Sequence, residues 1–322
     1  MNLPLTTDYD HGISAIDAQF HRPQRASIHL IVENGVAALV DTGTTFSIPG
    51  VIQVLTEKNL TVDDVAYIFL THIHLDHAGG ASECMRRLPN AKLVVHPRGA
   101  RHMADPTRLV AGAMAVYGET EFKRVYGEIH SIDANRIIEA PDEFRMQLNG
   151  RPLLFLDTPG HARHHYSIYD ERSNAFFTGD TFGVSYRDFD VAGMEFIFPT
   201  TTPVQFDPDA AHASIDRIMS YNPQHVFLTH YSRVGHLTQH AESIHSLIDQ
   251  FVDISKNANK SSSDRHATIS AAIQDLLLNR LIQHGCQLAP KDICDLLSSD
   301  IKLNTQGLEH WLDQSDQRIR HL

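Results

Sequence analysis

Three imidazoles and a carboxylate lie within six residues of the sequence, at His72, His74, Asp76 and His77. Imidazole and carboxylate groups are the ligands that zinc and other first-row divalent metals prefer. In an extended segment, the side chains at 72, 74 and 76 point the same way, because alternate residues share a face. His77 has the opposite parity and needs the turn offered by the following Ala-Gly-Gly to point inward. The cluster predicts a metal site, with a group of solvated histidines as the alternative.

The elements that must position this cluster are short apolar runs. The run Val-Ala-Tyr-Ile-Phe-Leu at 65–70 predicts a buried strand that ends directly before the cluster. The same event recurs three times further along the chain. Predicted strands at 152–156, 175–177 and 225–228 precede His161, Asp180 and His230. Strand ends at one edge of a sheet converge, so these side chains are expected to join the first cluster.

The remaining pattern alternates strands and helices, which is typical of an α/β fold. A hairpin is predicted from strands at 26–32 and 36–40, the second of which ends at Asp41. Helices are predicted at 48–55, 81–87, 108–116, 119–126 and 209–219, and strands at 92–96 and 166–169. After residue 235 the pattern is helical, with predicted helices at 237–251, after Asp264 as cap and up to Gly285, at 290–297 and at 305–312. A polar loop is predicted at 256–263.

Composition limits the class of function. The hydrophobic fraction of 42% and the charged fraction of 20% are typical of a globular protein. The net charge of −12 argues against nucleic acid as a partner, since phosphate binding needs a basic surface. The three cysteines, Cys84, Cys286 and Cys294, are too scattered for a disulfide framework and are expected to be free thiols. No signal peptide pattern and no apolar run of membrane-spanning length is present, so a cytoplasmic protein without a membrane partner is expected.

With these residues in view, the chain resembles the metallo-β-lactamase-fold superfamily of metallohydrolases, and among them the glyoxalase II and lactonase-like branch. The matching motifs are Val40-Asp41-Thr42-Gly43, the His-x-His-x-Asp-His loop at 72–77, Gly160-His161, Gly179-Asp180 and Thr229-His230. The resemblance covers roughly residues 25–235. It implies an αββα sandwich with a catalytic domain at 1–235. Residues 236–322 would form an α-helical C-terminal extension that covers the active-site opening or makes a homodimer surface.

The resemblance also implies a ligand set for two divalent metal ions. His72, His74 and His161 would hold one ion, Asp76, His77 and His230 the other, and Asp180 would bridge them. Zinc is the favoured metal, with iron and manganese as alternatives. Two such ions, about 3.5–4 Å apart, can share a water and make hydroxide available at neutral pH.

A dinuclear metal-dependent hydrolase is therefore predicted, acting with a metal-bridging hydroxide on a small carboxylic ester, thioester or lactone. The predicted catalytic residues are Asp76, which orients the hydroxide, the bridging Asp180, and Tyr231, which stabilises an oxyanion or only packs. Three alternatives stay open at this point. They are a phosphodiesterase of the same fold, an iron-dependent sulfur dioxygenase, and a ligand-binding or regulatory protein that retains metals but turns over weakly.

Other residues near these motifs have two interpretations each. Asp41 is expected to accept a ring N–H from a metal-binding histidine, or to form a strand-end turn. Binding of the substrate or a structural role is weighed for Arg163, His164 and His165. His96 is expected to be structural or exposed, and the pair His236 and His240, spaced one helical turn apart, is expected to lie on a solvated face.

Overall fold

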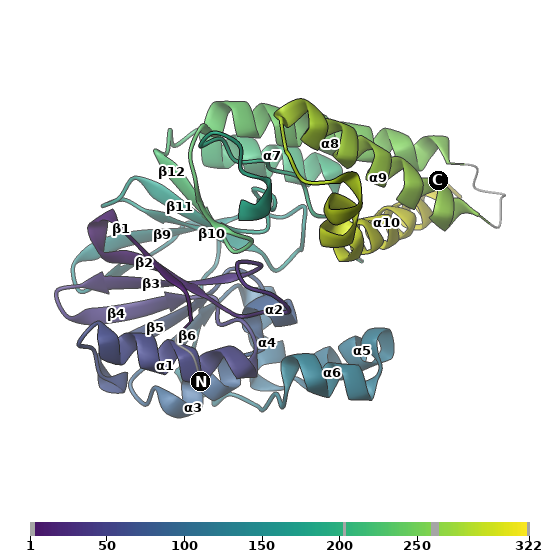
Figure 1. The fold of residues 1–322 in the computed structure, drawn as a ribbon. Coiled ribbons are helices and arrows are strands. Elements are labelled where there is room, and N and C mark those ends of the chain that lie inside the picture. Colours follow the sequence, from purple (N-terminus) through teal and green to yellow (C-terminus); the bar gives the residue numbers. More distant parts are fainter. Residues whose placement is uncertain (1–3, 202–203, 259–263, 321–322) are drawn as a thin grey trace. The chain divides into compact units, whose positions relative to one another are not determined.

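Two β-sheets contain all the strands of the described residues, and they are built from the apolar runs of the sequence (Figure 1). The structure is a computed structural model that describes residues 4–201, 204–258 and 264–320. The first sheet has the order β1-β2-β3-β4-β5-β6-β7, with strands at Thr6–Tyr9, Ile13–Asp17, Ser27–Glu33, Val36–Val40, Val65–Leu70, Lys92–Val95 and Ile137–Glu139. The second has the order β13-β12-β11-β10-β9-β8. Its strands, from β8 to β13, are Phe144–Leu148, Arg151–Asp157, Tyr166–Asp170, Ala175–Gly179, His225–Leu228 and Ser232–Val234.

The chain divides into two compact units. Both sheets belong to the first unit, which consists of Met1–Asp157, His164–Gly179 and Pro223–Val234. The second unit consists of Thr158–Arg163, Asp180–Asn222 and Gly235–Leu322, and it contains the C-terminal helices. The predicted domain boundary at residue 235 stays a prediction.

The core of the first unit explains why its strands are continuous apolar runs. Along β5, Phe69 packs between the two sheets, whereas Ile68 and Leu70 point to the opposite face, against helices. This alternation is the period of two of a strand, and here both faces are buried. The hydroxyl of Tyr166 in β10 donates a hydrogen bond of 2.8 Å to the carbonyl oxygen of Val94 in β6, which ties the two sheets together. The predicted mixed α/β fold with two facing sheets is confirmed.

Six helices of the first unit accompany the sheets: α1 (Ile48–Glu57), α2 (Leu75–Ala78), α3 (Ala81–Arg87), α4 (Pro97–Ala104), α5 (Thr107–Tyr117) and α6 (Glu119–Tyr126). Val51 of α1 and Met85 of α3 belong to the apolar cluster on the helix-covered face of the first sheet. The predicted helices at 48–55, 81–87 and 119–126 are confirmed within two residues. The predicted hairpin is confirmed as well, because β3 and β4 pair antiparallel around Asn34 and Gly35.

The helices of the second unit are α7 (Pro208–Met219), α8 (Leu237–Asn257), α9 (Arg265–His284) and α10 (Pro290–Arg320). Two expectations for them were wrong. The predicted separate helices at 290–297 and 305–312 are one continuous helix, because the residues between them contain no proline or glycine that would interrupt it. Asp264 precedes α9, but its side chain makes no capping hydrogen bond. Gly285 does end α9 in the left-handed conformation, as predicted. The predicted loop at 256–263 begins inside α8, which ends at Asn257 with Ala258 as its C-cap, and residues 259–263 lie outside the described residues.

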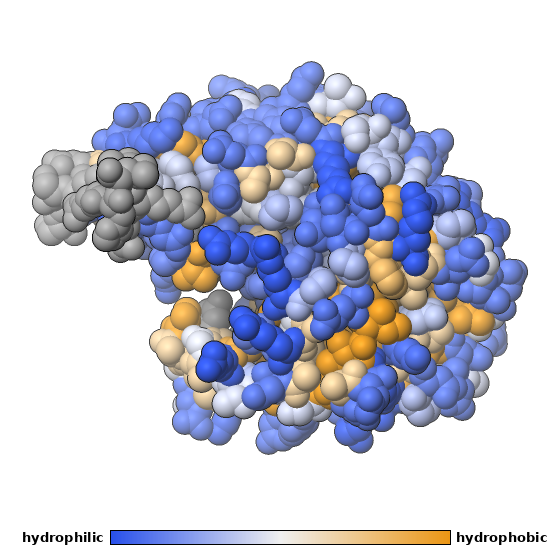
Figure 2. All heavy atoms as spheres, turned by 180° about the vertical axis from the view of Figure 1, so that it is seen from behind, coloured by the Kyte–Doolittle hydropathy of each residue, from blue (hydrophilic) through white to orange (hydrophobic). Residues whose placement is uncertain are grey.

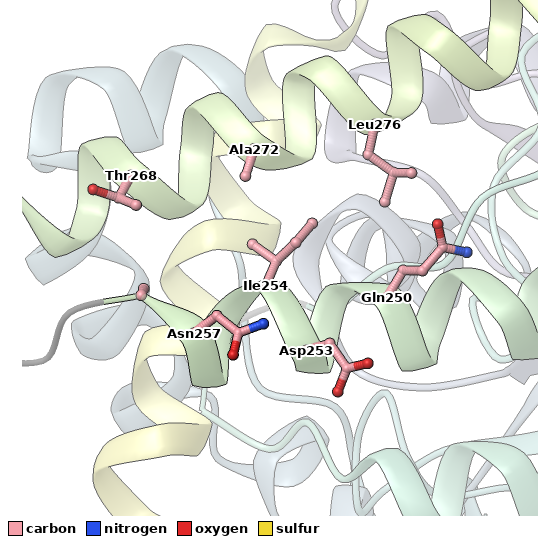
Figure 3. Close-up of a pocket in the computed structure, with 8 residues that line it drawn as sticks. Gln250, Asp253, Ile254, Asn257, Thr268, Ala272 and Leu276 are labelled. Atoms are coloured by element: carbon pink, nitrogen blue, oxygen red, sulfur yellow. The ribbon is translucent and has the colours of Figure 1, made fainter.

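A hollow of about 450 Å³ lies between α8 and α9 (Figure 3). Its lining includes the side chains of Gln250, Ile254 and Leu276, with Asp253 as its one carboxylate among the described residues. It contains none of the residues predicted as metal ligands.

The surface is hydrophilic over most of the face drawn in Figure 2, in keeping with the net charge of −12. Among the described residues, Cys84, Cys286 and Cys294 are free thiols, as expected. No helix in the described part of the chain combines the length and the apolar composition needed to cross a bilayer.

Candidate metal centre

Parallel strand pairs bring the predicted residues to the ends of the two sheets. In the first sheet β4 and β5 run parallel, so Asp41 and His72 follow neighbouring carboxyl ends. In the second sheet β11 and β12 run parallel, so Asp180 and His230 also follow neighbouring carboxyl ends. The hydroxyl of Thr229, the residue before His230, donates a hydrogen bond of 2.7 Å to Asp41.

Asp41 is a fully buried carboxylate that holds the first histidine loop together. It accepts hydrogen bonds from the backbone N–H of Thr71 at 2.9 Å and from the Thr71 hydroxyl at 2.9 and 3.0 Å. It also accepts from Nδ1 of His77 at 2.9 Å and has no exposed surface. The predicted contact between Asp41 and a ring N–H is therefore present. A buried charge of this kind is tolerated only where its oxygens are satisfied by donors.

Hydrogen bonds fix the tautomers of His77 and His230. Nδ1 of His230 lies 2.7 Å from the carbonyl oxygen of Arg25, as Nδ1 of His77 does from Asp41 at 2.9 Å. Both partners only accept, so each Nδ1 carries the hydrogen and each neutral ring has its lone pair at Nε2.

Both of these lone pairs face Asp76. Nε2 of His77 lies 3.8 Å and Nε2 of His230 lies 3.4 Å from Oδ2 of Asp76. Two lone pairs opposite a carboxylate oxygen repel one another unless a cation lies among them. A divalent metal ion fits this donor set, in which each histidine is oriented through its far nitrogen.

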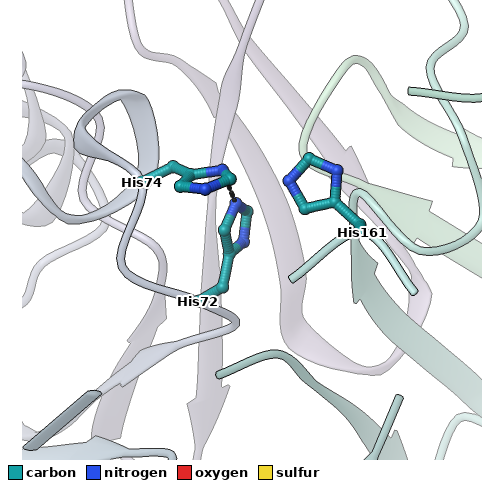
Figure 4. A group of neighbouring side chains, drawn as sticks. All are labelled: His72, His74 and His161. Carbon is teal, nitrogen blue, oxygen red and sulfur yellow. Dashed lines mark hydrogen bonds between the residues drawn. The ribbon is translucent and has the colours of Figure 1, made fainter. Parts of the chain in front are cut away.

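The first two histidines of the loop show the same arrangement. Thr71 Oγ1 gives its hydrogen to Asp41 and accepts from Nδ1 of His72 at 3.2 Å, which leaves the His72 lone pair at Nε2. That Nε2 lies 2.9 Å from Nδ1 of His74, as Figure 4 shows. Two ring nitrogens converge here as two ligands of one metal would.

Asp76, His77 and His230 of the first unit form a group that could hold a metal, because their ligand atoms lie within 4.8 Å of one another. His161 and Asp180 belong to the second unit. Nε2 of His161 also lies 3.4 Å from Oδ2 of Asp180. Assignment of these residues as ligands stays a prediction that this geometry supports.

The local backbone differs from the expectation at one point. Residues Leu75–Ala78 form the short helix α2, with His74 as its N-cap, so the segment is not extended beyond His74. The alternation of a strand therefore does not describe Asp76. The helical turn, and not the glycines after it, brings His77 back toward Asp41. The glycines serve close packing instead, because a Cβ on Gly80 would lie 2.7 Å from the carbonyl oxygen of Thr42.

Close packing also fixes the residue before Asp180. Gly179 has a φ of +50°, and a Cβ there would lie 2.6 Å from Nε2 of His165 and 2.7 Å from Oγ1 of Thr71. Both distances are far below ordinary contact, so only glycine fits at this position.

The residues for which either a role in substrate binding or catalysis or a structural role was weighed differ in their burial. His165 is fully buried, and its ring centre lies 5.0 Å from that of His72. The ring centre of His164 lies 5.6 Å from that of His74, and burial, followed by the charges of neighbouring histidines, lowers the pKa of His164 to about 3. Arg163 is exposed, and its backbone N–H donates to Gln205. The Tyr231 side chain is 2% exposed, and its predicted catalytic role stays a prediction.

Two other histidines have structural surroundings. His96 caps α4 by accepting from the N–H of Arg98, and its Nε2 lies 3.2 Å from Asp157, which agrees with the structural interpretation. The expectation of a solvated face was wrong for His240. That side chain is buried, and its Nε2 lies 3.2 Å from Oε2 of Glu195, a residue far away in the sequence that the helical spacing could not reveal.

Sequence reasoning missed the residues that orient the ligands. Thr71 and Thr229 donate to Asp41, and the Arg25 carbonyl orients His230. A signal for the threonines was available, since each directly precedes a predicted ligand, in Thr71-His72 and Thr229-His230. A backbone carbonyl leaves no trace in a sequence.

Comparisons with known proteins agree with this geometry. A family model described as the metallo-beta-lactamase superfamily matches residues 21–230. The metallo-beta-lactamase fold-containing protein ST1585 of Sulfurisphaera tokodaii is 27% identical over 224 residues, which are 68% of this chain and 77% of that protein. Its crystal structure superimposes with a TM-score of 0.63 over 94% of this chain and 99% of that chain, at 23% identity.

Two relatives have names that describe a reaction. The thioesterase pkgB of Emericella nidulans is 25% identical over 55% of this chain, and the match spans 44% of that protein. The hydroxyacylglutathione hydrolase of a Synechococcus strain is 27% identical over 46% of this chain, and the match spans 45% of that protein. The match thus spans less than half the length of each of these two relatives.

Proposed function

The chain belongs to the metallo-beta-lactamase superfamily of metal-dependent hydrolases, and from that premise we propose that it hydrolyses a small carboxylic ester, thioester or lactone with two divalent metal ions. The observation that carries the proposal is the convergence of the Nε2 atoms of His77 and His230 on Asp76, with both Nδ1 atoms committed elsewhere. The thioesterase and the hydroxyacylglutathione hydrolase among the relatives support this substrate class.

The ligand residues divide into two sets in this proposal. His72, His74 and His161 would hold one ion, Asp76, His77 and His230 would hold the other, and Asp180 would supply a further carboxylate. Zinc is the metal we propose for both positions. When bound, such ions lower the pKa of water from about 15.7 towards about 7 and polarise a scissile carbonyl.

The protein's own residues supply orientation and charge. Asp41 and the Arg25 carbonyl hold the hydrogen of His77 and His230 at Nδ1, so the Nε2 atom of each neutral ring is available to a metal. The carboxylates of Asp76 and Asp180 offset the charge of two cations. Burial, as the first cause, lowers the pKa of His164 to about 3, so that ring is neutral at physiological pH.

The test is a substrate panel combined with metal analysis. Wild-type enzyme loaded with Zn²⁺ is assayed on thioesters, lactones, carboxylic esters and phosphodiesters, beside the variants His77→Ala and His130→Gln. His130 is an exposed histidine near Glu128 and serves as the matched control. We expect His77→Ala to lower kcat/KM on the best substrate by about 100- to 10,000-fold and to lower the bound metal below two equivalents. The control should keep both.

Three results contradict the proposal. Turnover that survives in His77→Ala excludes this centre as the catalyst. Cleavage of phosphodiesters alone places the enzyme with the phosphodiesterases. A single bound iron together with oxygen consumption identifies a dioxygenase.

A further inference from the structure

A second histidine cluster lies on the helices α7 and α8 of the second unit. Each helix carries the pattern His-x-x-x-Asp, as His212 and Asp216 in α7 and as His245 and Asp249 in α8. Residues four apart lie on the same face of a helix, one turn from each other. The two patterns therefore present one imidazole and one carboxylate from each helix.

The pairing between the helices is crossed. Nε2 of His212 lies 3.2 Å from Oδ1 of Asp249, and Nε2 of His245 lies 3.2 Å from Oδ1 of Asp216. The two Nδ1 atoms face each other at 2.6 Å, with ring planes only 13° apart. The imidazole side chains are about a quarter exposed, at 26% and 27%, so an ion in solution can reach them.

The contacts with the carboxylates determine which nitrogen of His212 and of His245 carries the hydrogen, and they leave two lone pairs facing each other. A carboxylate at neutral pH only accepts, so each Nε2 carries the hydrogen of its neutral ring. Both Nδ1 atoms then present lone pairs to each other at 2.6 Å, which is repulsive unless a cation lies between them. Each ring shows the pattern of a metal-binding histidine whose far nitrogen is oriented by a carboxylate.

We propose that His212 and His245 bind a divalent transition-metal ion through their Nδ1 atoms, separately from the catalytic centre. Metal–nitrogen bonds of about 2.0–2.1 Å place two nitrogens about 2.9 Å apart at right angles and about 3.3 Å apart in a tetrahedron. The observed 2.6 Å is shorter than both distances, so the two rings would move slightly apart when an ion binds between them. The ring nitrogens of His72 and His74 show a similar approach, at 2.9 Å.

The ion would be structural and exchangeable. Within the described residues, this pair belongs to no group of three ligand atoms, so water completes the coordination. An ion that joins α7 to α8 would stabilise the position of α7, and the loop before His161 packs against that helix. Ser214 of α7 donates a hydrogen bond of 2.6 Å to the carbonyl oxygen of Pro159, and a Cβ on Gly160 would lie 2.4 Å from Cα of Ala211.

The experiment uses full-length enzyme whose catalytic centre is already loaded with Zn²⁺. One equivalent of Cu²⁺ is added, and its electron paramagnetic resonance spectrum and the melting temperature are recorded. The variants are His212→Gln, His245→Gln and, as control, His266→Gln, a histidine of α9 that pairs with Glu309. We expect a two-nitrogen Cu²⁺ spectrum and a raised melting temperature in the wild type and the control. Both effects should be lost in the first two variants.

A second pair of variants tests the role of the carboxylates. Asp216→Asn and Asp249→Asn should weaken Cu²⁺ binding by about 10-fold, the lower end of the range for groups that orient a ligand, because both carboxylates are largely exposed. The proposal is wrong if His212→Gln and His245→Gln keep the wild-type Cu²⁺ spectrum and affinity. It is equally wrong if the wild type binds no Cu²⁺ outside the catalytic centre, in which case the two rings share a proton instead.

Discussion

In the candidate metal centre and in the α7–α8 pair, histidines have their far ring nitrogen beside a carboxylate. The two clusters differ in whether that carboxylate is buried or exposed. In the centre, the far nitrogen of His77 is held by Asp41, which is completely buried and takes three further hydrogen bonds. In the helix pair, the far nitrogens meet Asp216 and Asp249, whose side chains are 75% and 72% exposed. A buried acceptor at a strand end cannot move, whereas an exposed one on a helix can.

The difference teaches how the same residue types acquire different functions. Buried hydrogen bonds in a low-dielectric interior fix tautomer and direction, which is what catalysis needs. Exposed pairs are screened by water and salt, so they contribute little on their own. An ion held by the helix pair is therefore expected to exchange readily, whereas one in the centre is expected to stay.

The largest expected difference between the two clusters is in folding stability, when Asp41→Ala is compared with Asp216→Ala. Removing the Asp41 carboxylate leaves several buried donors without their acceptor, and we expect the free energy of unfolding to fall by about 3–5 kcal/mol. Asp216→Ala removes an exposed group, so the change should stay within about 0.5 kcal/mol. Urea denaturation of the metal-free proteins measures both. Equal effects would show that burial does not distinguish the two clusters.

The pH dependence of folding stability tests the effect of burial at a further histidine. His29 of β3 lies in the interior of the first unit. Burial lowers the pKa of His29 to about 4 from 6.5, and the charge of Asp41 acts in the opposite direction. The unfolded chain therefore takes up this proton first as the pH falls. Stability should decrease between pH 6.5 and about 4, by about 3 kcal/mol for this group.

The measurement for His29 is urea denaturation at pH 7 and pH 4.5 in the presence of a chelator. His29→Gln removes the titrating ring, so the variant should lose less stability on acidification than the wild type. An identical loss in both proteins would assign the acid sensitivity to other groups.

The smallest expected effect is in the second unit, at Glu195. Burial alone would raise the pKa of Glu195, but hydrogen bonds from His240 and from backbone N–H groups, including that of Gly235, outweigh it and lower the pKa to about 2. This contribution is present above pH 4.5 and is lost as the pH falls towards 2. Because the carboxylate is half-buried and screened by water, we expect about 1–2 kcal/mol.

Glu195→Gln should reduce the loss of folding stability between pH 4.5 and about 2. It should leave unchanged the loss of stability at higher pH that is assigned to His29. The control is therefore the same variant measured between pH 7 and 4.5. If Glu195→Gln changes folding stability equally between pH 7 and 4.5 and below pH 4.5, the Glu195 carboxylate does not have the lowered pKa that its contacts indicate.

The sequence was a good guide wherever local pattern decides structure. The run at 65–70 predicted β5 to the residue, because six apolar residues rich in β-branched and aromatic types are too short for a typical helix and favour a buried strand. The four strand ends with their histidines and aspartates were also predictable, and Asp76, His77 and His230 of the first unit lie together in a group that could hold a metal.

What could not be predicted depends on partners far apart in the chain. The first two strands, Thr6–Tyr9 and Ile13–Asp17, are short, and they are defined by pairing with each other and with β3. The crossed contacts of His212 and His245 require that α7 and α8 lie side by side, which no spacing within one helix reveals. His240 was assigned to solvent for the same reason, because Glu195 was not visible as its partner.

Gly179 sets a limit for anyone who wishes to redesign this enzyme. No atom can be added at that point without displacing Thr71 and His165. Saturation libraries should therefore leave position 179 constant and place their diversity on loops whose side chains have room to vary.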